Sequence, residues 1–268
     1  MSVAGNCATR WSCSGGTILN LKVFAASVVI LSASLLNAQA PKSKPHLPTK
    51  FRFLNPSEVN PSQLLPPPPE DGSVEQQREM AEVKRLIHSR SKERYTQAVW
   101  DARHEDPTPF TAAIGPGFDL TKLPATARLL ADVSNDQNVA TSLAKEFFKR
   151  KFPVAAEMPA DYGEWTCDAE DRKPASRPLR SYPSGHATMA YTFGVVLSAL
   201  IPEKSQAILS RSASYAYSRE VCGDHYHSDV EAGHVLGTTL GVLLLHNEQL
   251  SPEVDAAKAE LKSAGIAE

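Results

Sequence analysis

The chain has 268 residues, of which 42% are hydrophobic and 22% are charged, and its formal net charge is -2. This length fits one domain with extensions, or at most two small domains. The composition is ordinary for a soluble globular protein, and the charge argues against a nucleic-acid or anionic-membrane surface that acts through bulk positive charge. Any anion-binding site must therefore be local, built from a few positioned cationic groups.

The first residues have the organisation of an export signal. A polar start is followed by an apolar run over 23–36 and by small residues at 37–40. We predict a signal peptide over 1–38, with cleavage after Ala38, and a periplasmic or secreted mature protein. The apolar run is short for a membrane span, so no stable membrane insertion is expected after cleavage. An uncleaved anchor or a lipoprotein is the alternative.

Cysteine usage agrees with export. Of the four cysteines, Cys7 and Cys13 would leave with the signal peptide. Cys167 and Cys222 remain, an even pair in a chain bound for an oxidising compartment. We predict one disulfide between them, and two separate buried thiols are the alternative.

Residues 39–72 form a proline-rich lead-in that includes four consecutive prolines at 66–69. Such a stretch favours an extended path without internal hydrogen bonds. We expect it to lie over the surface of the domain that follows.

Helical periodicity dominates residues 73–268, which we predict to be one domain. Apolar spacing predicts helices over 73–99, 121–133, 138–149, 186–201, 204–219 and 229–246. An irregular charged loop is expected over 153–182. Because no strand-like alternation is persuasive, the predicted fold class is all-α, a compact helical bundle.

The last predicted helix is nearly all apolar and has Gly233, Gly237 and Gly241 four residues apart. Glycines at this spacing leave a smooth strip on one helix face, which permits close approach of a neighbouring helix. The apolar run is only about fourteen residues, too short for a typical span. A central core helix is therefore predicted.

Three clusters carry residues suited to chemistry. The first, Pro183-Ser184-Gly185-His186, is a turn that opens into an apolar-faced helix. A helix N-terminus presents free backbone N–H groups and partial positive charge, which together attract anions. Gly185 lets the backbone approach a ligand, and Ser184 offers a hydroxyl. The alternative is a simple helix cap beside an incidental histidine.

The second cluster is Ser218-Arg219, followed after five residues by His225 and after three more by Asp229. Arginine offers a planar fork that suits phosphate oxygens. An aspartate four residues after a histidine can hold one ring nitrogen and leave the other as a nucleophile. The alternative is a solvated salt-bridge face.

The third cluster is Lys145 within the basic segment 145–153. By itself this segment is typical of a solvated helix end.

In order and spacing, the three clusters resemble the signature of the phosphatidic acid phosphatase type 2 superfamily, which includes the vanadium haloperoxidases. That signature is lysine, six residues, Arg-Pro; then Pro-Ser-Gly-His; then Ser-Arg, five residues, His, three residues, Asp. The chain is most similar to the class A bacterial non-specific acid phosphatases, through 64–69, 181–186 and 221–225. The likeness runs from about Phe53 to His246.

The resemblance implies an acid phosphatase that hydrolyses phosphate monoesters through a phosphohistidine, with no metal and no cofactor. His225 would be the nucleophile, oriented by Asp229, and His186 would be the general acid and then the base that activates water. The groups implied to bind the phosphoryl oxygens are Lys145, Arg219, Ser184 and the backbone N–H of Gly185. Phosphoryl transfer requires this set of an in-line nucleophile, an opposed proton donor and charge neutralisation. An acidic optimum is expected because only one histidine must be protonated.

The chain departs from the signature at one position. Six residues after Lys145 stands Phe152, before Pro153, where the family has arginine. Phenylalanine cannot bind an oxyanion, and loss of one such donor costs on the order of a hundredfold in rate. Arg150 and Arg180 are the candidate substitute donors.

Two other functions stay open. A vanadium-dependent haloperoxidase would hold vanadate in the same site as a cofactor, whereas vanadate would inhibit a phosphatase. A degenerate phosphate-binding homologue would have little turnover because of Phe152. For the phosphatase, the expected partners are small organic phosphate monoesters, and a homodimer or higher homo-oligomer is compatible with the resemblance.

The remaining histidines are expected to be less important. His227, beside the proposed nucleophile, is a candidate to line the pocket. His234 and His246 are predicted to be helix residues with local hydrogen bonds. No grouping of His, Cys, Asp and Glu has the spacing of a structural zinc site.

Overall fold

The computed structural model describes residues 50–157, Cys167 and 179–268. The predicted signal peptide at 1–38, the start of the proline-rich lead-in at 39–49 and most of the predicted loop at 153–182 lie outside the described residues. Every regular element among the described residues is helical, and none is a strand. The predicted all-α fold class is confirmed.

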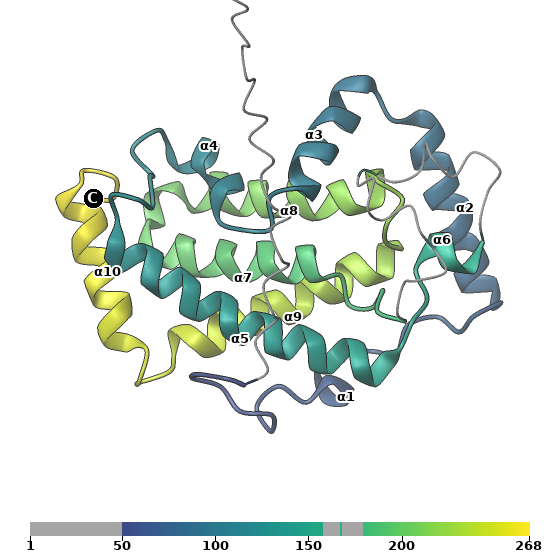
Figure 1. Ribbon diagram of the computed structural model, residues 1–268, viewed down its shortest axis with the longest axis horizontal. Helices are drawn as coiled ribbons and strands as arrows, with labels where there is room; N and C mark the ends of the chain where they lie inside the picture. The colour runs from purple at the N-terminus through teal and green to yellow at the C-terminus, as the bar shows by residue number, and fades with distance from the viewer. Residues whose placement is uncertain (1–49, 158–166, 168–178) are drawn as a thin grey trace, which may run out of the picture. The chain divides into compact units, whose positions relative to one another are not determined.

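Figure 1 shows the helices in order along the chain. They are α1 (Pro61–Leu64), α2 (Val74–Ser89), α3 (Lys92–Ala102), α4 (Thr111–Ile114), α5 (Pro124–Phe148), α6 (Pro153–Ala156), α7 (Gly185–Leu200), α8 (Ser205–Val221), α9 (His227–Leu245) and α10 (Ser251–Ser263), with 3-10 turns η1 (Thr108–Phe110) and η5 (Pro202–Lys204). Helix α7 is the centre of the bundle: it packs most extensively against α9 and α8, and also against α5. Helix α3 lies along α8, and α10 lies against α5.

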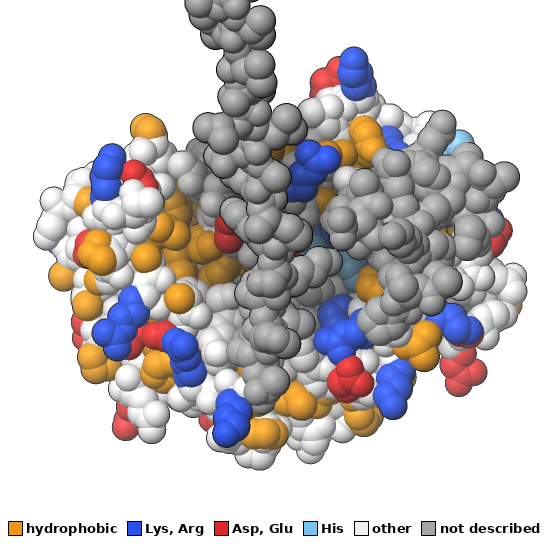
Figure 2. All heavy atoms as spheres, viewed as in Figure 1, with side chains coloured by type: hydrophobic (Ala, Val, Ile, Leu, Met, Phe, Trp, Pro, Cys, Tyr) orange, Lys and Arg blue, Asp and Glu red, His pale blue; other side chains and the backbone are white. Residues whose placement is uncertain are grey.

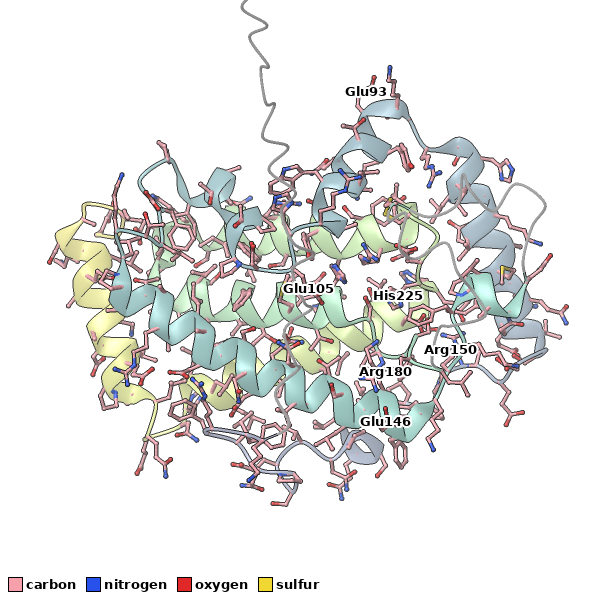
Figure 3. All side chains as sticks on the ribbon, viewed as in Figure 1. Glu93, Glu105, Glu146, Arg150, Arg180 and His225 are labelled. Atoms are coloured by element: carbon pink, nitrogen blue, oxygen red, sulfur yellow. A yellow bond between two sulfur atoms is a disulfide. The ribbon has the colours of Figure 1, made fainter. Side chains whose placement is uncertain are left out.

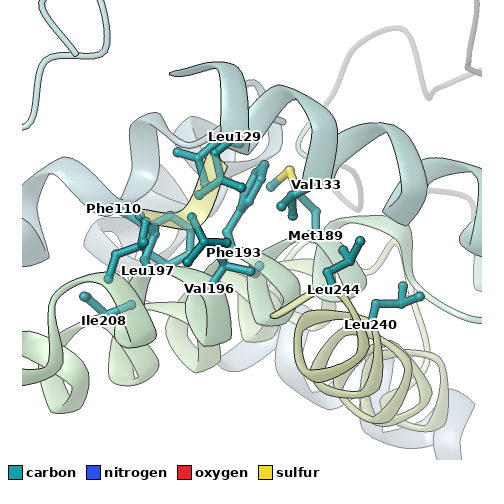
Figure 4. Packing of buried hydrophobic residues seen from close by; sticks show 14 of the residues in the cluster. Phe110, Leu129, Val133, Met189, Phe193, Val196, Leu197, Ile208, Leu240 and Leu244 are labelled. Atoms are coloured by element: carbon teal, nitrogen blue, oxygen red, sulfur yellow. The ribbon is translucent and has the colours of Figure 1, made fainter. Parts of the chain in front are cut away.

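The main hydrophobic core fills the space between these central helices (Figure 4). Leu129 and Val133 reach it from α5, while Phe193 and Leu197 reach it from α7, and all four are fully buried or nearly so. Phe110 meets Phe193 edge-on, with ring centroids 6.4 Å apart. Burial of such large side chains is the main favourable contribution to folding. The core therefore fixes α5, α7, α8 and α9 relative to one another.

The glycine strip of α9 lies directly against the start of α7. A Cβ at Gly233 would stand 2.7 Å from the Cβ of Ala187, and one at Gly237 would stand 2.3 Å from the Thr188 carbonyl oxygen. No side chain fits at those distances, so the predicted close approach is confirmed. The contact brings the N-termini of α7 and α9 together, and the Ser184 N–H donates to the Asp229 carbonyl at 2.8 Å. Within the described residues, no helix is both long and apolar enough to cross a membrane.

The predicted single helix over 73–99 is wrong, because the structure has α2 and α3 with a break between them. Arg90 has extended backbone angles, and Ser91 caps α3 by accepting from the Arg94 N–H at 3.2 Å. A serine cap satisfies one of the donors that a helix start leaves free. The apolar periodicity continues across the break and therefore conceals it.

The predicted interruption between 133 and 138 is also wrong, because α5 runs continuously through it. Its polar residues serve the lead-in instead of ending the helix. Asp136 is fully buried and accepts the backbone N–H groups of Arg52, Phe53 and Leu54 at 2.7–2.9 Å. These contacts, with the Tyr182 hydroxyl that donates to the Pro66 carbonyl at 2.6 Å, hold the described part of the lead-in on the bundle.

Candidate active site

His225 and Asp229 lie at the junction of α8 and α9, and both are buried. The Nδ1 atom of His225 stands 3.3 Å from Oδ2 of Asp229, four residues later in the chain. Because a carboxylate can only accept, Nδ1 carries the shared proton and Nε2 keeps its lone pair. Figure 3 shows His225 inside the bundle, close to Arg150. This arrangement orients the His225 ring and leaves the Nε2 lone pair available.

The Asp229 carboxylate is surrounded by donors. Ser181 Oγ donates to Oδ2 at 2.6 Å, the Tyr226 N–H donates to Oδ2 at 3.0 Å, and Arg150 Nη1 donates to Oδ1 at 2.7 Å. Burial alone would raise the pKa of Asp229, but the hydrogen bond from His225 and the charge of Arg150 outweigh it and lower the pKa. The carboxylate therefore stays ionised although it is buried away from solvent.

Burial has the opposite effect on the imidazole of His225. Desolvation lowers the pKa of His225 to about 3, although Asp229 pulls it upward and the cations Lys145 and Arg219 push it further down. The ring is therefore neutral over most of the acidic range. A neutral ring has the lone pair that a nucleophile requires.

The N-terminus of α7 forms the second part of the site. Ser184 is the N-cap, buried, and its hydroxyl accepts from the Ala187 N–H at 3.4 Å. Gly185 is the first helical residue, and a Cβ there would stand 3.8 Å from Cε of Lys145. The first backbone N–H groups of α7 thus lie beside the lysine of α5. Their partial positive charge and that of the lysine favour an anion between them.

Lys145 lies in the last turn of α5, and its Nζ donates to the backbone carbonyl of Arg180. Burial lowers the pKa of Lys145 to about 7, while Asp229 raises it and Arg180 lowers it. The ammonium charge is therefore complete in acid and is lost as the pH rises through neutrality. Lys145 therefore offers a full positive charge to an anion at acidic pH.

Arg219, near the end of α8, is 4% exposed. Its Nη2 donates to Asp224 Oδ2 at 2.7 Å, but its Nε and Nη1 are buried without a hydrogen-bond partner. Buried donors are nearly always paired, because an unpaired one costs free energy. Two unpaired guanidinium donors in the interior therefore indicate a position for an oxyanion.

His186 is the second residue of α7, and its Nε2 is likewise buried without a hydrogen-bond partner. Its Nδ1 stands 3.7 Å from Oε1 of Glu105, and its ring stacks on Tyr215 with centroids 5.9 Å apart. Burial lowers the pKa of His186 to about 4, and the positive charge of Arg219 adds to this effect. Figure 3 shows Glu105 beside the middle of the bundle, on the side of α3. An anion bound next to His186 would raise its pKa and favour the protonated ring.

Phe152 occupies the position where the signature has arginine. Its ring centroid is 5.3 Å from that of His225, and Lys145 Nζ is 6.0 Å from the same ring. The aromatic ring therefore lies within the site itself. It presents an apolar surface to the nucleophile and offers no donor in place of the arginine.

The two candidate substitute arginines are engaged by carboxylates. Arg150 bonds Asp229 through Nη1 and Glu79 through Nη2, at 2.7 and 2.6 Å. Arg180 pairs with Glu146, and Figure 3 shows the two near the end of α5. Arg150 Nε is buried without a hydrogen-bond partner, but both outer nitrogens of Arg150 are bonded to carboxylates. Arg150 and Arg180 are thus held by carboxylates, and Arg219 is the arginine left to bind an oxyanion at the candidate site.

The predicted disulfide between Cys167 and Cys222 is confirmed. Cys222 directly follows α8 and is fully buried. Because it stands three residues before His225, the bond restrains the turn that carries the nucleophile.

The other histidines lie outside this constellation. His227 has a mostly exposed side chain and pairs with Glu220 at 3.2 Å. His246 bonds the Val242 carbonyl at 2.9 Å, as predicted for a helix residue, and His234 stacks on Tyr191. Over 50–157, Cys167 and 179–268, no group of three or more His, Cys, Asp and Glu side chains could hold a metal ion. On the face in Figure 2, lysine, arginine and histidine side chains gather to the right of centre.

Three residues of the site escaped sequence reasoning. Glu79 and Tyr215 belong to no motif and come from helices α2 and α8. Ser181 is part of a segment that carries the family resemblance, but nothing in its local sequence predicts a hydrogen bond to Asp229. The sequence alone does not show which distant carboxylate an arginine will bond.

Comparison with known proteins covers the whole site. Residues 129–251 match the PAP2 superfamily. A non-specific acid phosphatase from Providencia stuartii is 32% identical over 250 residues, which is 90% of this chain and 96% of the relative. An acid phosphatase from Zymomonas mobilis is 27% identical over 85% of this chain and 83% of its own length. A non-specific acid phosphatase from Salmonella typhimurium is 29% identical over 69% of this chain and 74% of its own length.

Proposed function

Since the chain belongs to the class A bacterial acid phosphatases of the PAP2 superfamily, and is thus a phosphoric monoester hydrolase, we propose that it is an exported enzyme whose His225 forms a phosphohistidine, with neither metal nor cofactor. The observation that carries this proposal is the set of buried nitrogens without hydrogen-bond partners on Arg219 and His186, together with the charge of Arg219, which acts on both His186 and His225. Small organic phosphate monoesters are the proposed substrates.

The phosphoryl group of the substrate would lie between the N-terminus of α7 and Arg219. Arg219 Nε and Nη1, the protonated Lys145 and the backbone N–H of Gly185 would neutralise its equatorial oxygens, with the Ser184 hydroxyl beside them. Such donors act strongly in a buried site because little water screens them. These groups would supply the charge stabilisation that metal ions supply in many other phosphoryl-transfer enzymes.

In the first step, the Nε2 lone pair of His225 forms a bond to phosphorus, and the bond from phosphorus to the ester oxygen breaks. The leaving oxygen takes the proton from the imidazolium of His186 and departs as an alcohol. The positive charge that develops on the His225 ring is stabilised by Asp229 through Nδ1. The products are the alcohol, a phosphohistidine and a neutral His186.

In the second step, His186 accepts a proton from a water molecule, whose oxygen attacks phosphorus. The nitrogen–phosphorus bond breaks, its electron pair returns to Nε2 of His225, and inorganic phosphate leaves. His186 ends protonated and ready for the next cycle. Each histidine therefore regains its starting state.

Burial acts on both histidines: it lowers the pKa of His186 to about 4 and that of His225 to about 3. A bound phosphate raises both pKa values because its negative charge favours the imidazolium. Activity is thus expected in acid, where His186 is protonated and His225 is neutral.

The test is hydrolysis of p-nitrophenyl phosphate by the full-length protein at about pH 5 with a chelator present. We expect chelator-resistant turnover and an acid-labile phosphoenzyme, and a loss on the order of 10⁴-fold or more in His225→Ala. His246→Ala, a partly exposed helix-end histidine, is the control and should retain activity. Turnover that survives His225→Ala would overturn the nucleophile. Bromide oxidation with vanadate and peroxide would instead indicate a haloperoxidase. Phosphate binding without turnover would instead indicate a phosphate-binding homologue.

Export is tested separately. The mature protein from the producing bacterium should begin at Gln39, and it should be released with the periplasmic or culture fraction. A full-length protein retained in the membrane fraction would contradict this part of the proposal.

A further inference from the structure

Arg150, between α5 and α6, is held in a fork between two carboxylates. Its Nη1 donates to Oδ1 of Asp229 at 2.7 Å, and its Nη2 donates to Oε2 of Glu79 at 2.6 Å. The three side chains are 2%, 0% and 15% exposed, respectively, for Arg150, Asp229 and Glu79. Charges so poorly solvated interact strongly, and their geometry determines whether they stabilise or destabilise the fold.

Glu79 does more than close this fork. Its second oxygen, Oε1, accepts the backbone N–H of Ser228 at 2.8 Å, in the first turn of α9. Arg150 Nη1 also donates to Ser228 Oγ at 2.7 Å, and its guanidinium lies 4.1 Å from the ring centroid of Tyr226. Glu79, from α2, thus contacts both the arginine and the helix turn that carries Asp229.

We propose that Glu79 is a positioning residue that acts through Arg150 on the Asp229–His225 pair. The inference rests on the proposed function, since it concerns the nucleophile of that reaction. Glu79 itself would not contact the substrate. Arg150 would then have a role other than that of a substitute phosphate donor.

Geometry is the first part of this role. With Nη2 fixed on Glu79, the plane of the guanidinium is set, and Nη1 meets Oδ1 of Asp229 rather than Oδ2. Oδ2 is then left to Ser181, the Tyr226 N–H and His225. Without Glu79, the guanidinium could rotate and compete for Oδ2, which would weaken the bond that orients the imidazole.

Charge is the second part. Arg150 paired with Asp229 alone would be neutral, and the ring of His225 would have no net negative charge behind it. With Glu79 the three groups sum to one negative charge, which favours the positive charge that develops on the ring in phosphohistidine formation. The other charged groups that act on His225 are Lys145 of α5 and Arg219 of α8.

The test is Glu79→Gln in the full-length protein, which keeps the shape and removes the charge. We expect kcat and the rate of phosphoenzyme formation to fall about 10–100-fold, with KM changed less than about threefold. The acid limb of the pH–rate profile should move to lower pH, because removal of a nearby negative charge lowers the pKa of the nucleophilic histidine. Arg150→Lys should lower kcat similarly, since an ammonium cannot span both carboxylates in one plane, but it keeps the charge and should leave the acid limb in place.

The two substitutions should also be non-additive: Glu79→Gln should have little further effect on kcat in an Arg150→Lys background. Asp136→Asn is the matched control, because it alters a buried carboxylate that accepts three N–H groups outside the site. It should lower Tm but leave kcat per folded molecule and the acid limb unchanged. If Glu79→Gln behaves as this control does, Glu79 only stabilises the fold and the inference is overturned. If His225→Ala retains turnover, the proposed function itself fails.

Discussion

The two histidines stand in two halves of one candidate site, and the polar groups of the two halves are paired differently. The side chain of His225 is 5% exposed and that of His186 is 16% exposed. On the His225 side, the Asp229 carboxylate has donors on both oxygens, and Arg150 is bonded by Glu79 in turn. On the other side, Arg219 Nε and Nη1 and His186 Nε2 lack hydrogen-bond partners, whereas on the His225 side Arg150 Nε lacks one but both outer nitrogens of Arg150 are bonded. We call the first the anchored half and the second the open half.

The difference shows which hydrogen bonds the fold itself completes. In the anchored half, protein groups bond one another except at Arg150 Nε, so the His225 ring is oriented before any ligand arrives. In the open half, donors are kept unpaired at a cost in stability of about 1–3 kcal/mol for each buried group. That cost is offset when an oxyanion supplies the missing acceptors, and the same donors then act on the transition state.

The largest expected effect comes from removing the open half's main donor. Arg219→Ala should lower kcat/KM about 10²–10³-fold, because two charge-assisted bonds to the transferring group are lost. Vanadate binding, measured by inhibition, should weaken in parallel. Arg85→Ala, which removes an exposed arginine of α2, is the control and should change neither value. If vanadate inhibited Arg219→Ala and the parent protein equally well, Arg219 would not bind the oxyanion, and the distinction between the two halves would be wrong.

A gain is expected from Phe152→Arg, which restores the signature residue. The Phe152 ring lies beside both His225 and Lys145, so an arginine there can add a donor to the open half. We expect kcat/KM to rise about tenfold or more at acidic pH, measured with p-nitrophenyl phosphate. Phe152→Leu, which keeps an apolar side chain, should show no gain. A loss in the arginine variant would mean that the aromatic ring has a role that a positive charge cannot replace.

The pH dependence of anion binding sharpens the comparison further. Lys145, with a pKa lowered to about 7 by burial, is charged below that pH and neutral above it. Sulfate keeps its charge over this range, so its Kd should rise about tenfold for each pH unit between the pKa of Lys145 in the free protein and its higher pKa in the complex, measured by calorimetry between pH 6 and 9. Lys145→Met should bind sulfate more weakly at pH 6 and show no such slope. A parent protein without the slope would contradict the position of Lys145 beside the anion.

The smallest effect on chemistry is expected from the Cys167–Cys222 bond. Replacing both residues by serine should lower stability by about 2–4 kcal/mol, which thermal unfolding would show as a lower Tm. The bond lies close to His225 but contacts no reacting group, so kcat per folded molecule should fall less than about threefold at 25 °C. If the fully folded variant lost much of its kcat, the disulfide would have to be counted among the contacts that orient His225 in the anchored half.

Sequence reasoning succeeds for features that depend on short separations along the chain. Helix geometry brings residues four apart onto one face, so the spacing alone matches His225 with Asp229. The Ser184-Gly185 turn is recognisable as a helix start by the same local rules. The cysteine pair follows from counting thiols in a chain that is predicted to be exported, and the four-spaced glycines predict a close helix contact.

Sequence reasoning fails where local signals are equivocal. Apolar periodicity runs across the break at Arg90–Ser91, and polar residues near Asp136 suggest a break that does not exist. In both places a hydrogen bond to a side chain decides the result. The Ser91 cap starts a new helix at α3, so α2 and α3 are separate. The backbone N–H groups of the lead-in bond the buried carboxylate of Asp136, so α5 continues through that residue.

By itself, the sequence determined the two histidines, the aspartate, the helix-start cradle and the one departure at Phe152. Only the tertiary structure decided that Arg150 joins Glu79 to Asp229, and that Arg219 keeps two donors unpaired. The difference lies in how far apart along the chain the contacting residues are. Contacts within a helical turn follow from backbone geometry, whereas an arginine's choice among distant carboxylates depends on how the core brings α2, α5 and α9 together.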